Sequence, residues 1–260
     1  MLPRVIPVLL LDNGGLFKTT AFRDPVYLGD PINTVRIFND KSCDELMMLD
    51  VSATAEHREP DYELIAQVAG ECFMPLCYGG GVRTLAQFNK LFSIGVEKVA
   101  VNNTALGNPR LLREAAAEFG CQSVVVVIDY QKRFGRKARV FGDRGRQATK
   151  WEPIQYARFL EEQGVGEIVL QAIDRDGSMR GYDIPMVRAV VDAVKMPVVA
   201  CGGAGNVDDI VSVLRDGRAG AAAGGSMFVF QGPHRAVLIS YPDKAGIEER
   251  VSAKIKEISR

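Results

Sequence analysis

The chain has 260 residues, of which 47% are hydrophobic and 25% are charged, a composition typical of a folded globular protein with a sizeable core. Its 32 lysines and arginines balance its 32 aspartates and glutamates, so no general basic field exists to attract nucleic acid or an anionic membrane. Five cysteines without a CxxC pair and only two histidines argue against a disulfide framework, a metal site or a histidine-based triad, and favour a cytoplasmic protein.

The first predicted strand, Val5–Leu10, is followed by Leu11, Asp12 and a turn at Asn13-Gly14-Gly15. Its apolar run is too short to span a membrane and has no small-residue cleavage site after it, so neither a membrane span nor a signal peptide is expected. The turn is expected to interrupt the strand, and the carboxylate of Asp12 would then not follow the inward direction of Leu10. No carboxylate is therefore expected to enter the interior from this strand.

Short apolar runs alternate with helical patterns along the rest of the chain. The predicted strands are Val5–Leu10, Leu46–Asp50, Pro75–Tyr78, Val99–Val101, Val124–Asp129, Ile168–Ile173, Val198–Cys201 and Ala219–Ala223. The predicted helices are Pro31–Asp40, Asp61–Cys72, Leu85–Gly95, Pro109–Gly120, Pro153–Gln163, Ile184–Val194 and Val207–Asp216. Eight strands of continuous hydrophobicity predict an α/β fold, a single (β/α)8 TIM barrel in one domain over residues 1–260. A doubly wound open sheet is the main alternative.

Two helix starts carry specific capping signals. Thr84 is predicted to cap the third helix, in which four apolar residues make one stripe. Asn108 is predicted to cap the fourth helix, with Pro109 at the first helical position and Gly120 at the end.

The two halves of the chain resemble each other. Residues 74–84 read MPLCYGGGVRT and residues 196–206 read MPVVACGGAGN, an offset of 122 residues. The same offset places Asn102-Asn103-Thr104 on Gly224-Gly225-Ser226, each at the end of an apolar strand. Two similarities in register predict a duplicated half-barrel and favour a closed barrel over an open sheet.

The duplicated loops follow strands and precede helices. Backbone N–H groups of glycine can approach an anion closely there, and the positive end of the next helix adds to the attraction. We therefore expect two phosphate sites on opposite sides of the barrel mouth and a ligand with a phosphate at each end; the alternative is glycines that only make tight turns. The predicted phosphate-binding residues are Gly80, Gly81, Asn102, Asn103, Asp176, Gly177, Gly202, Gly203, Gly225 and Ser226.

Asp129 ends the fifth strand, where a carboxylate could act as a general acid or base on a ligand held between the phosphates. The alternative for Asp129 is a loop cap that accepts N–H groups. Asp174 and Asp176 lie in the polar insertion that follows the sixth strand. Their Asp-x-Asp-Gly pattern is also a common turn, so a structural role competes more strongly for them.

The segments DELMMLDVSAT, YGGGVRT, EKVAVN, VVVVID, GEIVLQAIDRDGSMRGYD and ACGGAGN stand in an order and spacing that resemble the cyclase subunit of imidazole glycerol phosphate synthase. That subunit uses ammonia from a glutaminase in histidine biosynthesis. The resemblance covers about residues 1–230 and implies a duplicated half-barrel, two phosphate grips and a glutaminase bound at the opposite, N-terminal face. No cofactor and no metal are expected.

The resemblance also reveals a departure in the catalytic pair. The family uses two aspartates, at the ends of strands 1 and 5; Asp129 matches the second, but Leu10 occupies the first position. A leucine cannot move a proton, and losing one group of an acid/base pair commonly costs about 10²–10⁴-fold in rate. Gln171 and Cys201 stand where the family usually has small hydroxyl residues. Imidazole ring closure is therefore not expected to be the main activity.

Four charged residues stand at the starts of strands 1, 2, 4 and 6: Arg4, Glu45, Lys98 and Glu167. Two cations and two anions could close a neutral ring across the barrel floor, whereas the simpler interpretation is four solvated strand ends. The resembled family has its ammonia gate at these matching positions. Ammonia delivery is therefore expected to be kept.

An intact gate with a broken catalytic pair is similar to a paralogous branch of the family that supplies ammonia to a third protein, which converts an acetamido into an acetamidino group on a cell-surface sugar. The tail GPHRAVLISYP (residues 232–242) also looks like that branch. Two alternatives stay open: a true histidine-pathway cyclase in which Asp129 does most of the work, and a noncatalytic scaffold for a bisphosphate or sugar nucleotide. A phosphosugar isomerase is least favoured, because it too needs a carboxylate on strand 1.

Overall fold

The computed structural model describes residues 4–132 and 137–258, with side chains up to residue 252. Eight parallel strands in these residues close into a barrel, because each pairs with the next and the last pairs with the first. The strands are β1 (Arg4–Asp12), β4 (Leu46–Asp50), β5 (Leu76–Gly79), β6 (Lys98–Val101), β7 (Val124–Gln131), β10 (Glu167–Ala172), β11 (Val198–Cys201) and β12 (Ala221–Gly224). The predicted (β/α)8 TIM barrel is confirmed.

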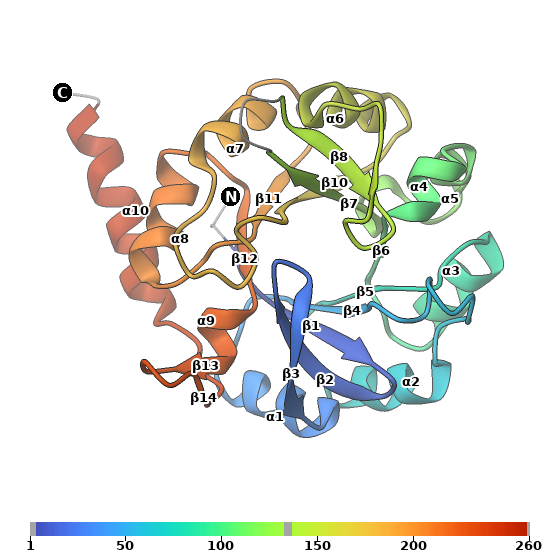
Figure 1. The fold of residues 1–260 in the computed structure, drawn as a ribbon, viewed down its shortest axis with the longest axis horizontal. Coiled ribbons are helices and arrows are strands. Elements are labelled where there is room, and N and C mark those ends of the chain that lie inside the picture. The colour runs from blue at the N-terminus through green and yellow to red at the C-terminus, as the bar shows by residue number, and fades with distance from the viewer. Residues whose placement is uncertain (1–3, 133–136, 259–260) are drawn as a thin grey trace.

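Helices surround the strands (Figure 1). They are α1 (Pro31–Asp40), α2 (Tyr62–Glu71), α3 (Leu85–Ser93), α5 (Arg110–Phe119), α6 (Pro153–Glu162), α7 (Ile184–Val191) and α8 (Val207–Arg215). Thr84 caps α3 as predicted, in a capping box with Gln87. The predicted cap at Asn108 is wrong, because the N–H of Asn108 bonds to Thr104 O and thereby ends the short preceding helix. Pro109 takes the N-cap position instead.

The duplication is visible in elements outside the basic barrel. The first strand of each half continues into antiparallel strands: β2 (Gly15–Thr20) and β3 (Arg23–Gly29) after β1, and β8 (Arg139–Gly142) and β9 (Gln147–Ala148) after β7. The fourth strand of each half is followed by a short helix, α4 (Asn103–Gly107) after β6 and α9 (Ser226–Val229) after β12. None of these elements was predicted from the apolar runs.

The C-terminal part adds a small hairpin and a long helix. The hairpin is β13 (Phe230–Gln231) with β14 (Ala236–Val237), and the helix is α10 (Lys244–Ile258), which packs against α8. A single 3-10 turn, Cys121–Ser123, precedes β7. Among the described residues, no helix has the length and hydropathy required to cross a membrane.

The core has two layers, because successive residues of a strand point to opposite faces. Outward residues such as Leu9 and Ile128 pack under the helices, whereas inward residues such as Ile6 and Val125 fill the barrel interior. Each fully buried aliphatic side chain contributes about 1.5–3 kcal/mol. The inner layer between floor and mouth is entirely apolar in composition.

Candidate functional site

A cavity of about 410 Å³ opens where the parallel strands end. Its lower wall is apolar and includes Val8, Met47 and Val169, whereas its upper wall carries charged and amide side chains. The C-terminal ends of barrel strands are where this fold places its chemistry. The predicted residues Gly80, Gly81, Asn102, Asn103, Asp129, Asp176 and Gly225 all line this cavity.

Asp129 lies at the end of the inward face of β7 and is 9% exposed. Burial, with a smaller effect of the nearby Asp176 carboxylate, raises the pKa of Asp129 to about 8. Asp129 is therefore mostly protonated at neutral pH, and its Oδ2 lies 3.3 Å from Nδ2 of Asn102. A neutral carboxyl group that lines a cavity can serve as a general acid.

Two further positions share the level of Asp129. The ladder pairs Asp129 with Gln171 and Gln171 with Cys201. Both side chains are 7% exposed and line the cavity. Burial raises the pKa of the Cys201 thiol, so the group is a protonated thiol rather than a thiolate nucleophile.

The expectation for Asp12 is wrong. β1 continues unbroken through Asp12, and the turn begins only at Asn13, where Asn13 (φ 48°) and Gly14 (φ 78°) make a two-residue hairpin turn into β2. An Asn-Gly turn of this kind extends both strands instead of interrupting them. Asp12 consequently shares the face of Leu10, and both line the cavity.

Lys18 is a cavity residue that sequence reasoning missed. It lies on β2, is 4% exposed, and its Nζ is 3.0 Å from both carboxylate oxygens of Asp176. Its aliphatic stem packs over Gly225, where an added Cβ would lie 2.6 Å from Lys18 Cε. Asp176 is thus the partner of a buried lysine in this structure, and the hairpin is held to the mouth by this ion pair. The only sequence signal that could have identified Lys18 was its position as a single lysine beside the apolar residues Leu16 and Phe17.

The first glycine site is open to the cavity. Gly80, Gly81, Asn102 and Asn103 line it, and the Oδ1 of Asn103 accepts a hydrogen bond from the N–H of Asp143, at 2.8 Å. This bond ties the β8–β9 turn to the site, and two arginines of that turn, Arg144 and Arg146, also line the cavity. Backbone N–H groups, amides and guanidinium groups are the donors that phosphate prefers. Sequence reasoning missed both arginines.

The second glycine site has the same close backbone packing as the first, where a Cβ on Gly80 would lie 2.4 Å from Asp50 O, but it differs in its contact with the cavity. A Cβ on Gly203 would lie 2.2 Å from Gly181 O, and one on Gly202 would lie 2.6 Å from Ala172 O, so close backbone contacts already require these glycines. Gly177, Gly202, Gly203 and Ser226 are not among the described residues that line the cavity. The hydroxyl of Ser226 accepts a hydrogen bond from Arg235 at 3.4 Å. The two predicted phosphate sites are therefore not equivalent in this structure.

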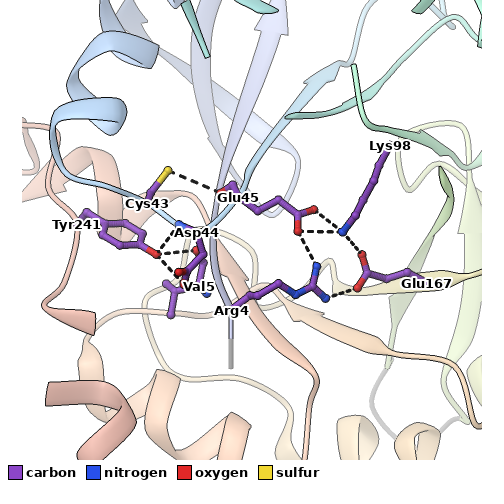
Figure 2. A network of polar contacts seen from close by, with 8 residues as sticks. All are labelled: Arg4, Val5, Cys43, Asp44, Glu45, Lys98, Glu167 and Tyr241. Atoms are coloured by element: carbon purple, nitrogen blue, oxygen red, sulfur yellow. Dashed lines mark hydrogen bonds and ion pairs between the residues drawn. The ribbon is translucent and has the colours of Figure 1, made fainter. Parts of the chain in front are cut away.

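The four charged residues at the barrel floor form the predicted ring (Figure 2). Arg4 Nη1 is 2.5 Å from Glu45 Oε2, and Arg4 Nη2 donates to Glu167. Lys98 Nζ lies 2.9 Å from both carboxylate oxygens of Glu45 and 2.9 Å from Glu167 Oε2. Each cation contacts both anions, so the interpretation as separate solvated strand ends is wrong.

Burial and pairing compete within this ring. Desolvation would raise the pKa of Glu167, but hydrogen bonds and charge from Arg4 and Lys98 outweigh it and hold that pKa below its ordinary value. Desolvation would likewise lower the pKa of Lys98, and the two glutamates raise it instead. Glu167 and Lys98 therefore stay charged at neutral pH, as does Arg4, whose pKa is also raised. Removing one partner of such a buried network commonly costs about 3–5 kcal/mol.

The interior between ring and cavity is filled by aliphatic, thiol and methyl groups. Cys77, Ala100 and Ala221 are among its residues, and each is at most 2% exposed. The inner cluster consists of 12 buried hydrophobic residues, with Leu10 and Leu49 packed against it. Among such side chains a charged solute would lose its hydration at a much higher cost than a small neutral molecule.

Comparison with known proteins adds to this geometry. Residues 4–232 match the family model described as histidine biosynthesis protein. The chain belongs to this family. Within the family, it is 53% identical over 240 residues to a Pseudomonas aeruginosa protein provisionally named imidazole glycerol phosphate synthase subunit hisF2, covering 92% of this chain and 96% of that relative.

Two further members are similar over nearly the same length. A Leptospira borgpetersenii protein provisionally named imidazole glycerol phosphate synthase subunit HisF is 46% identical over 243 residues, covering 93% of this chain and 95% of the relative. A Vibrio vulnificus protein provisionally named subunit hisF3 is 45% identical over 240 residues, covering 92% of each chain. The predicted membership of the cyclase-subunit family is confirmed, and the relationship supports an enzyme subunit.

Proposed function

We propose that this barrel is an ammonia-channelling subunit that takes ammonia from a glutaminase and supplies it for acetamidino modification of a cell-surface sugar. One observation carries the proposal: the Arg4/Glu45/Lys98/Glu167 ring is complete, while Leu10 stands where the related cyclase needs a carboxylate. The four residues of the proposed ammonia entrance are all present, whereas only one residue of the acid/base pair, Asp129, is present. The proposal includes a cytoplasmic location and a single barrel domain.

The floor and interior suit neutral ammonia. Every charge of the ring is compensated by another member, so the ring offers no unpaired anion that would trap ammonium. Above the ring, a charged ammonium ion would lose its hydration against apolar walls, which is costly, while NH₃ would not carry that cost. Passage therefore requires deprotonation before or at the ring and a small displacement of one ion pair.

The glutaminase would dock on the floor side. Phe73 lies between α2 and β5, at the end where the strands begin, and it is 88% exposed. An exposed aromatic side chain is costly to leave in water, and aromatic residues are enriched among binding hot spots. We propose that Phe73 contacts the glutaminase beside the ring.

The mouth would hold a phosphorylated small molecule. Gly80, Gly81, Asn102, Arg144 and Arg146 supply donors on one side of the cavity, and Asp129 supplies a neutral carboxyl group. Because Gly202, Gly203 and Ser226 do not line the cavity, and Lys18 packs over Gly225, one phosphate at the first site is favoured over a bisphosphate. A third, sugar-amidating protein would receive the ammonia at this face.

Reconstitution tests the proposal. The barrel, its glutaminase and the amidating protein should make amidine from glutamine, and omission of the barrel should abolish this but spare the reaction with added ammonium. Glu167→Gln, which removes one ring charge at constant size, should lower the glutamine reaction selectively. Amidine made equally well from glutamine without the barrel would end the proposal.

A second candidate function is the cyclase of histidine biosynthesis. Asp12 favours it, because a second carboxylate faces the cavity that contains Asp129. Complementation of a histidine auxotroph that lacks the cyclase distinguishes the two. Growth that depends on both Asp12 and Asp129 would establish the cyclase, and absence of growth with a well-expressed protein would favour ammonia channelling.

A further inference from the structure

The floor-side ends of β1 and β4 are joined in an unusual way. Their ladder runs from Val8↔Met47 to Leu11↔Asp50, an offset of 39 residues. Below the ladder, Val5 and Asp44 keep the same offset, but the Val5 N–H donates to the Asp44 side chain, at 2.9 Å from Oδ2. A side chain thus replaces a backbone acceptor at the level of the floor.

Tyr241 completes this junction from the C-terminal segment. Its hydroxyl accepts from the Asp44 N–H at 3.2 Å and lies 2.9 Å from Val5 O and 3.1 Å from Asp44 Oδ2. Lys244 also pairs with the Asp44 carboxylate. The Tyr241 ring stacks on Phe228, with centroids 5.9 Å apart. Burial raises the pKa of Tyr241, so its hydroxyl stays a donor.

This junction lies directly beside the ring (Figure 2). Val5 follows Arg4 in the chain, and Asp44 precedes Glu45, so Tyr241 binds the chain neighbours of two ring members that come from different strands. The contact joins residues that lie 236 and 197 positions apart. A shift of the Tyr241 hydroxyl would therefore change the separation of the backbones that carry Arg4 and Glu45.

We propose that Tyr241 is a positioning residue for the floor ring: it sets the Arg4–Glu45 side of the ring through Val5 and Asp44. The inference rests on the proposed function, since it treats the ring as the entrance for ammonia. Tyr241 touches none of the four ring side chains in Figure 2 and acts through the backbone. A residue that merely anchors the tail would affect stability but would leave the distribution of ammonia unchanged.

Tyr241→Phe tests the proposal, because phenylalanine keeps the stacking on Phe228 and removes only the hydroxyl. The matched control is Tyr27→Phe on the β3 hairpin, where the tyrosine is 60% exposed. In the three-protein complex with glutamine labelled at the amide nitrogen, the share of label that reaches the amidine product is compared with the share released as free ammonia. Tyr241→Phe should lower the ratio of the two by about threefold, the size expected for one hydrogen-bonding group.

The rate with added ammonium should stay unchanged in Tyr241→Phe, and Tyr27→Phe should match the wild type in both reactions. Asp44→Asn should show the same loss as Tyr241→Phe, which keeps the test available if one variant does not fold. Thermal unfolding of each variant shows that transfer is measured on folded protein.

Glu45→Gln distinguishes a failure of the positioning role of Tyr241 from a failure of the proposed function. If Glu45→Gln lowers transfer but Tyr241→Phe and Asp44→Asn match the wild type, the positioning role is overturned while the proposed function stands. If Glu45→Gln also leaves transfer unchanged, the ring is not the entrance and both fail. A loss in Tyr241→Phe that appears equally with added ammonium would also overturn the positioning role.

Discussion

Leu10 and Asp12 project from β1 into the same cavity, two residues apart on one unbroken strand. This places the Asp12 carboxylate about 7 Å further along the strand than the Leu10 side chain. Asp12 is half-buried, whereas Asp129 is deeply buried and mostly protonated at pH 7. The mouth thus has an apolar residue at the deeper level of β1 and a carboxylate at the rim.

Restoring the carboxylate at the deeper level should restore cyclase chemistry. If Leu10 occupies the position of the first aspartate of the resembled cyclase, Leu10→Asp should raise imidazole glycerol phosphate formation by about 10²-fold or more, because it adds a second acid/base group beside Asp129. The product is measured with ammonium as the nitrogen source. Leu10→Asn has nearly the same size without a proton to transfer and should give no gain. Equal rates in the two variants would show that position 10 does not limit the reaction.

The raised pKa of Asp129 predicts a pH-dependent stability. Between about pH 4 and pH 8 the folded state binds a proton that the unfolded state has lost, so wild-type stability falls as pH rises, by about 1.4 kcal/mol per unit from this group. Asp129→Asn has no titrating group at this position. Its stability relative to the wild type should therefore rise by about 1.4 kcal/mol per pH unit up to about pH 8. Urea denaturation at several pH values measures the difference.

Asp40 is exposed, and Asp40→Asn serves as the control for Asp129→Asn. A constant gap between Asp129→Asn and wild type across pH 5 to 8 would mean that Asp129 is ionised in the folded protein.

The Lys18–Asp176 pair should contribute to stability through its burial. Lys18→Met leaves the Asp176 carboxylate buried without a cation, and the free energy of unfolding should fall by about 3–5 kcal/mol. Adding Asp176→Asn to Lys18→Met removes the unpaired charge and should recover most of the loss. Denaturant unfolding of the wild type, Lys18→Met, Asp176→Asn and the double variant completes the double-mutant cycle. A single variant as stable as the wild type would show that the hairpin does not depend on this pair.

Phe73→Ala should weaken binding of the glutaminase without destabilising the barrel. Because the side chain is 88% exposed, unfolding should change by no more than about 0.5 kcal/mol. Loss of a hot-spot aromatic residue typically costs about 2 kcal/mol, roughly a thirtyfold weaker Kd. Calorimetric titration measures it. Val26→Ala, on the mouth-side hairpin and 48% exposed, should bind as wild type; equal affinities for all three proteins would place the partner elsewhere.

Local patterns in the sequence determined the alternating strands and helices, the duplicated halves and the floor positions Arg4, Glu45, Lys98 and Glu167. These are properties of contiguous residues: hydrophobic runs, helix caps and the charge that begins each strand. The direction of Asp12 failed as a prediction because an Asn-Gly turn can either end a strand or extend it into a hairpin, and only the pairing of Asp12 with Gly15 decided between them.

Contacts between distant residues were decided by the tertiary structure alone. Lys18 meets Asp176 across 158 positions, and Tyr241 meets Asp44 across 197, and no local signal connects the members of either pair. The packing of Gly181 on Gly203 likewise follows from the tertiary structure and not from the glycine motif. Barrel closure brings such residues together, so the partner of each depends on the whole fold. Hydrophobic periodicity and turn chemistry, in contrast, act within a few residues of the chain.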